Sequence, residues 1–153
     1  MAGTFSQIYI HYVFAVKGRA NLLDKKWRQE VFKYMNGIIK GKEQKPIIVN
    51  GVGDHVHVLV GIKPSISIAD LIRDIKNNSS RFINEQKWLK GKFEWQEGYG
   101  AFSVSPAQLD VLYNYILNQE MHHEKRSFRE EYHQFLNEYQ ISFEERFLFD
   151  FLE

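Results

Sequence analysis

The stretch GVGDHVHVLVGI, residues 51–62, decides the fold, because it reads as a buried strand that carries two histidines. Side chains alternate between the two faces of a strand. The alternate valines are therefore predicted to enter a core, whereas His55 and His57 point together to the opposite face. Two imidazoles about 6–7 Å apart along one strand can converge on one metal ion. Two histidines that only pack or form hydrogen bonds are the alternative interpretation.

The flanking segments place this strand in a sheet. Residues 7–17 and 45–52 are rich in β-branched and aromatic residues and predict further strands. Residues 92–105 predict a last strand pair or a bulged strand, broken at Gly98 and Gly100. Apolar residues at helical spacing predict helices over 24–41 and 65–88. The order β-α-β-β-α-β predicts an α+β, ferredoxin-like split β-α-β fold, an antiparallel sheet with two helices on one face. The first strand and the histidine strand are expected to be central neighbours.

A third helix is predicted to follow the last strand, and it has the best-marked start in the sequence. Ser105 with Gln108 forms the pattern of a capping box. The helix includes LYNYILNQEMHH, residues 112–123, in which Tyr115 and Gln119 are four residues apart and share a helical face. If this helix covers the open face of the sheet, it brings a tyrosine hydroxyl and an amide oxygen to the histidines.

Length and composition favour one folded domain over residues 1–153, with a core of about 5–123 and a C-terminal helical extension of about 124–153. Hydrophobic residues make up 44% of the 153 residues, which is enough for a real core. The chain has no cysteine, so disulfides and thiolate metal sites are excluded. The N-terminus shows no signal-peptide pattern and no apolar run is long enough to span a membrane. A cytoplasmic location is expected.

Charge is distributed unevenly along the chain, although the net charge is only +1. Residues 1–100 carry 16 Lys and Arg against 9 Asp and Glu, whereas residues 101–153 carry 4 against 10. A basic body favours a partner with phosphates, and an unevenly charged solvated surface is the alternative.

A metal site needs more ligands than two histidines. The residue types that could complete it with nitrogen or oxygen are Asp54, His11, Gln119 and the pair His122/His123. The residues alone do not choose among these candidates.

Taken together, these motifs resemble a known family. His-hydrophobic-His at 55–57, followed by Tyr-x-x-x-Gln at 115–119, resembles the HUH endonuclease superfamily. More closely, it is similar to the single-tyrosine transposases of small insertion sequences, which move as single-stranded DNA. HYVFAVKGR at 11–19 and WQEGYGAFSVS at 95–105 also resemble family motifs. The resemblance extends from about residue 9 to about residue 123.

The resemblance implies a reaction. Mg²⁺ or Mn²⁺ is expected to be held by His55, His57 and Gln119, and Tyr115 is expected to be the nucleophile. Its attack on a phosphodiester leaves a 5′-phosphotyrosine and frees a 3′-OH. The covalent link conserves the bond for rejoining, so no nucleotide cofactor is expected. No residue in the sequence identifies itself as the general base.

The resemblance also implies partners. The expected substrate is single-stranded DNA with hairpins at the ends of the element, and no membrane is involved. One tyrosine per chain implies a homodimer, because two strand ends must be cut. The cations expected to contact DNA are Lys17, Arg19, Arg73, Lys76 and Arg81.

Three other functions remain open at the level of sequence. A replication or mobilisation nickase of the same superfamily is the first, and a catalytically inactive, domesticated DNA-hairpin-binding protein is the second. A ferredoxin-like metal-binding protein unrelated to DNA is the third.

Overall fold

The computed structural model describes residues 3–121 and 127–138. Four strands form one antiparallel sheet in the order β2-β3-β1-β4. They are β1 (Tyr9–Ala15), β2 (Lys45–Gly51), β3 (His55–Gly61) and β4 (Gly100–Val104). The predicted α+β fold is confirmed, and the histidine strand β3 and the first strand β1 are its central neighbours.

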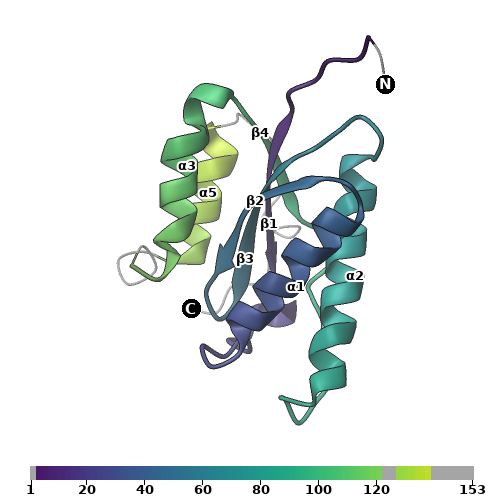
Figure 1. The fold of residues 1–153 in the computed structure, drawn as a ribbon. Coiled ribbons are helices and arrows are strands. Elements are labelled where there is room, and N and C mark those ends of the chain that lie inside the picture. The colour runs from purple at the N-terminus through teal and green to yellow at the C-terminus, as the bar shows by residue number, and fades with distance from the viewer. Residues whose placement is uncertain (1–2, 122–126, 139–153) are drawn as a thin grey trace.

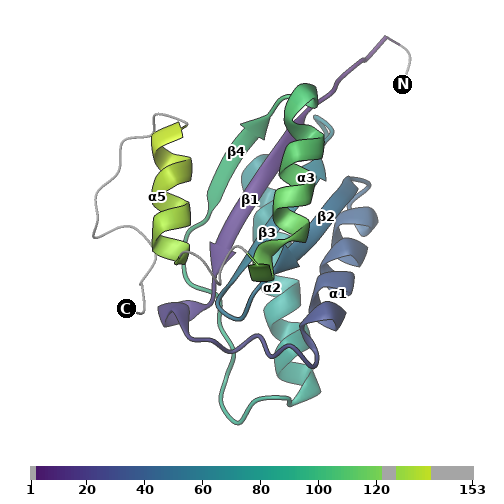
Figure 2. The ribbon, with the colours of Figure 1, turned by 90° about the vertical axis from the view of Figure 1, so that its left-hand side faces the viewer.

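Helices cover both faces of the sheet. On one face lie α1 (Arg28–Gly41) and α2 (Ile68–Gln86), and on the other lie α3 (Leu109–Leu117) and α5 (Phe128–Glu138) (Figure 1). Seen from the second face, α3 runs over β2 and β3, whereas α5 lies beside β4 (Figure 2). A short 3-10 turn, η1 (Lys17–Arg19), follows β1, and a second one, η2 (Pro106–Gln108), precedes α3. None of the described helices is long and apolar enough to cross a membrane.

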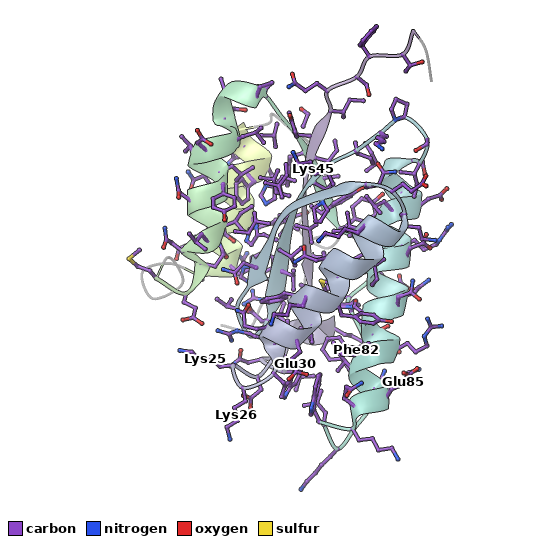
Figure 3. All side chains as sticks on the ribbon, in the orientation of Figure 1. Lys25, Lys26, Glu30, Lys45, Phe82 and Glu85 are labelled. Carbon is purple, nitrogen blue, oxygen red and sulfur yellow. The ribbon has the colours of Figure 1, made fainter. Side chains whose placement is uncertain are left out.

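The larger core lies between the sheet and the helices α1 and α2. Val56, Val58 and Val60 face it from β3 and are fully buried, as their alternation predicts. Between the two helices, Tyr34 of α1 stacks on Phe82 of α2 with ring centroids 4.1 Å apart; Figure 3 labels Phe82. The sheet face under α1 and α2 is therefore apolar, and the polar residues of the central strands lie on the opposite face.

The second face carries two smaller apolar clusters. Under α3, Ile116 packs with Leu59 and Val104. Under α5, Phe128 packs with Val13 and Phe102. The polar residues of β1 and β3 lie between these clusters, which enclose them.

Several element boundaries differ from those predicted. Within the predicted strand 92–105, β4 comprises only Gly100–Val104, and Trp95 forms an isolated bridge to Val16. The helix α3 ends at Leu117, and after an interruption at Asn118 residues 119–121 are helical again. The side-chain amide of Asn50 donates to the carbonyl oxygens of Ile116 and Leu117 at 2.9 and 3.2 Å. Both carbonyls belong to the last turn of α3, so these bonds tie β2 to the helix beside its interruption at Asn118.

Candidate metal centre and tyrosine site

His55 and His57 both point from β3 toward the second face of the sheet, because Nε2 of each ring lies 3.3 Å or less from Oε1 of Glu131 in α5. Both side chains are fully buried. Hydrogen bonds of β3 to both neighbouring strands hold the backbone on either side, which fixes the direction of the two rings. The expectation that both imidazoles share one face is confirmed.

The residue that the two histidines face is Glu131 of α5. Its Oε1 lies 3.3 Å from Nε2 of His55 and 3.0 Å from Nε2 of His57. The ligand atoms of these three residues lie within 4.8 Å of one another, and all three side chains are fully buried. A buried carboxylate with two imidazole nitrogens is a donor set that can hold a divalent cation.

Glu131 was not among the residues singled out in the sequence. The signal that could have found it is its place in α5. Phe128, Tyr132 and Leu136 form a buried stripe at helical spacing, and Glu131 lies on the same face. A carboxylate on the buried face of an amphipathic helix needs a partner, because an isolated buried charge is costly.

Gln119 also reaches His55, in line with the expectation that its helix brings an amide oxygen to the histidine strand. Its side chain is fully buried, with Oε1 3.3 Å from Nε2 of His55. Its Nε2 donates to Oε2 of Glu131 at 3.3 Å. Gln119 therefore lies next to the two histidines and the carboxylate, and its role as a metal ligand stays a prediction. His122 and His123 lie outside the described residues.

The hydroxyl of Tyr115 donates a hydrogen bond to Oε2 of Glu131. The tyrosine lies on the buried side of α3 and is half-exposed. Its ring contacts that of His57 edge-on, with centroids 6.2 Å apart. The candidate nucleophile, both histidines and Gln119 thus meet around one carboxylate, within a single chain.

A second layer of polar residues lies behind the histidines. Asp54 accepts a hydrogen bond from Nδ1 of His55 at 2.7 Å. Asp54 in turn accepts from Nε and Nη2 of Arg19 at 3.2 and 2.8 Å. On the other histidine, Nδ1 of His57 lies 2.8 Å from Nε2 of His11.

The charges in this layer shift several pKa values. Burial alone would raise the pKa of Asp54, but the hydrogen bond and charge of His55, together with Arg19, lower it to about 2. Burial alone would lower the pKa of His55, but its hydrogen bonds to Asp54 and Glu131 raise that pKa above its usual value. For His11, burial and then the nearby His57 hold the pKa well below the usual value, so this imidazole is neutral.

The predicted DNA-binding cations have different surroundings. The side chains of Lys17, Arg73 and Arg81 are exposed by 68%, 60% and 65%, and each lies near a surface carboxylate. Lys76 is half-buried and donates to two backbone carbonyls of the loop before β4. Arg19 is only 4% exposed and is bound to the Asp54 carboxylate, which fits a structural contact better than a surface contact with phosphate.

Comparison with known proteins found a matching family model and similar solved structures. A family model described as "Transposase IS200 like" matches residues 4–119. A candidate transposase from Deinococcus radiodurans R1 has a similar structure, with a TM-score of 0.63 and 22% identity over 78% of this chain and 95% of that one. The REP-associated tyrosine transposase bound to a REP hairpin has a TM-score of 0.59 and 12% identity, over 80% of this chain and 74% of that one. Among curated protein sequences, none matches at a significant level.

Proposed function

Because this chain belongs to the family of IS200-like transposases, we propose that it cleaves and rejoins single-stranded DNA at the ends of an insertion sequence through Tyr115. The observation that supports this most directly is the meeting of the Tyr115 hydroxyl with His55 and His57 around one buried carboxylate. A tyrosine with only a packing role does not require its hydroxyl to lie beside a buried carboxylate and two histidines.

The proposed metal site uses His55 and His57 with an oxygen ligand from Glu131, Gln119 or both. Mg²⁺ and Mn²⁺ favour oxygen ligands, and Mn²⁺ also accepts imidazole, so the donors present fit either ion. When bound, the ion would polarise the scissile phosphate and stabilise the leaving 3′ oxygen.

Tyr115 and Glu131 supply the rest of the chemistry. In the proposed step, the phenolic oxygen of Tyr115 bonds to phosphorus and the bond from phosphorus to the 3′ oxygen breaks. The tyrosine must lose its proton, and its hydroxyl already donates to Oε2 of Glu131. This carboxylate can accept the proton and return it to the 3′ oxygen, so no outside base is needed. Rejoining runs the same step in reverse with another 3′-OH.

An adduct assay tests this proposal. The protein is incubated with labelled single-stranded DNA carrying the hairpin and flank of its own genomic neighbourhood, in Mn²⁺, Mg²⁺ or EDTA. We expect a denaturation-resistant protein–DNA adduct with wild type in a divalent cation, and none with Tyr115→Phe. Tyr113→Phe is the matched control, because Tyr113 lies on the same helix and is 38% exposed. Loss of the adduct in the control alone would assign the nucleophile to Tyr113 and refute the proposal.

DNA contact is proposed for the exposed part of the basic body. Lys76, Arg81 and Lys92 line an open cleft of about 660 Å³ between α2 and the segment before β4, although glutamates line it too. If Lys76 and Arg81 each contact a phosphate, their replacement by alanine lowers the slope of log affinity against log salt concentration by about 1.5. Lys42→Ala, at the end of α1, is the control. An unchanged slope would remove this cleft from the DNA interface.

If wild type binds the hairpin DNA but forms no adduct with it, the result would favour an inactive hairpin-binding protein.

A homodimer is proposed on chemical grounds. Moving an element requires two strand ends to be cut, and each chain offers one tyrosine at the site. The arrangement described here, with Tyr115 beside the histidines of its own chain, supports a complete site in each protomer. Sedimentation of the protein with and without hairpin DNA tests this: a single-chain mass in both conditions would contradict the dimer.

A further inference from the structure

We propose that His11 and Asp54 are positioning residues, which fix the two site histidines in the tautomer that directs both Nε2 lone pairs at one ion. This inference rests on the proposed metal site. It gives a role to the buried His11 and to Asp54, whose side chain is 17% exposed; the proposed reaction uses neither.

The argument starts from what a metal-bound imidazole requires. A neutral histidine has one protonated nitrogen and one with a free lone pair, and only the latter binds metal. In both histidines, Nε2 is the nitrogen that faces Glu131. Binding through Nε2 requires the proton to reside on Nδ1, where it needs an acceptor. Such partners behind metal-bound histidines orient the ring and fix the tautomer.

Asp54 supplies the acceptor for His55. Its Oδ1 lies 2.7 Å from Nδ1, and its Oδ2 is held by two hydrogen bonds from Arg19. The arginine is itself only 4% exposed, and its guanidinium carbon lies 5.1 Å from the centre of the Phe128 ring. That ring stacks on His55 with centroids 4.0 Å apart. Arg19, Asp54 and Phe128 therefore hold the His55 imidazole at its Nδ1 edge and across its face.

His11 supplies the acceptor for His57. Its Nε2 lies 2.8 Å from Nδ1 of His57, and its side chain is 1% exposed. With the two rings in this arrangement, one proton is shared between the two facing nitrogens. A proton on Nδ1 of His57 makes His11 the acceptor and leaves Nε2 of His57 free for an ion. Phe102 and Phe135 contact the His11 ring, which keeps it in this place.

The two histidines are thus served by different acceptors, a carboxylate and an imidazole. This difference allows the two arms of the proposal to be tested separately. His11→Gln retains an acceptor oxygen near the position of Nε2, whereas His11→Met has similar size and offers no such acceptor. Asp54→Ala removes the acceptor of His55, and Asp110→Ala, an exposed aspartate at the start of α3, is its control.

The primary experiment measures tautomers directly. Nitrogen–proton correlation spectra of the ¹⁵N-labelled full chain, loaded with diamagnetic Zn²⁺ as a probe, report which ring nitrogen carries the proton. We expect both His55 and His57 to be protonated at Nδ1 and bound at Nε2. Coordination through Nδ1 in either histidine would overturn the proposal. Because the spectra are recorded on the wild-type protein, the result does not depend on the folding of any variant.

The second measurement is Mn²⁺ affinity by calorimetry. We expect His11→Met and Asp54→Ala each to weaken binding roughly 10–100-fold, the usual effect of losing such a partner. His11→Gln and Asp110→Ala are expected to stay within about threefold of wild type. Equal weakening by His11→Gln and His11→Met would assign His11 a packing role only. Failure of wild type itself to bind metal would instead refute the proposed metal site, so the two failures are distinguishable.

Discussion

The carboxylate of Asp54 allows a quantitative prediction about stability, because its environment differs sharply between the folded and unfolded chain. In the folded protein its side chain is 17% exposed, and it accepts hydrogen bonds from His55 and Arg19. Its pKa falls from 3.8 to about 2, because the partners outweigh the effect of burial. Replacing it by asparagine removes the titrating group with almost no change in size.

The magnitude follows from this shift. At about 1.4 kcal/mol per pKa unit, Asp54 contributes about 2 kcal/mol to the free energy of unfolding when it is ionised. Because the folded-state pKa lies below the unfolded-state value, this contribution is fully present above about pH 4. It is lost as the pH falls through about 2. His55 is protonated across this range, since its own pKa is raised, so the partner charge does not change.

The assay is urea denaturation of the metal-free protein between pH 5 and pH 2, for wild type and Asp54→Asn. In the variant, the asparagine side chain has only one acceptor oxygen, so its NH₂ group must face a donor of either His55 or Arg19. The variant is therefore expected to be less stable than wild type at pH 5. The informative quantity is the difference between the two proteins, which should shrink by about 2 kcal/mol as the pH falls to 2. A difference that does not change with pH would show that Asp54 gains nothing from its ionised form, and the reasoning would fail.

Three further predictions concern the parts that build the site. Phe128→Ala removes a buried ring stacked on His55 and should cost about 3–5 kcal/mol of unfolding free energy in urea titrations; a cost below about 1 would mean that α5 is not held by this contact. As the pH increases toward the raised pKa of His55, Mn²⁺ affinity should rise about tenfold per pH unit, because the ion must displace the imidazole proton; calorimetry showing no pH dependence would contradict this. Gly51→Ala should lose about 1–3 kcal/mol of stability, because its methyl group would collide with the backbone of His55, whereas Gly37→Ala in open space on α1 should gain about 0.5–1; equal thermal shifts would refute this difference.

Local patterns in the sequence predicted the sheet, and the family resemblance added to them most of the residues that meet at the site. Strand alternation placed His55 and His57 on the same face, since that depends only on the geometry of β3. The capping box at Ser105 marked the turn that leads into the tyrosine helix, and the backbone N–H of Ser105 donates to Oε1 of Gln108 as that box requires. Element bounds were less accurate: the tyrosine helix is interrupted at Asn118, beside carbonyls that accept hydrogen bonds from Asn50, which is far away in sequence.

Glu131 and the second layer required the tertiary structure. The hydrogen bond from His57 to Glu131 joins residues 74 positions apart, and that from Arg19 to Asp54 joins residues 35 apart. The sequence shows that α5 has a buried face, but not which surface that face covers. Only the packing of α5 against β1 and β4 directs its carboxylate at the two histidines. The sequence alone therefore determined which residues share a face, because this follows from local backbone geometry. Which faces meet was decided by the tertiary structure, because docking depends on contacts between distant segments.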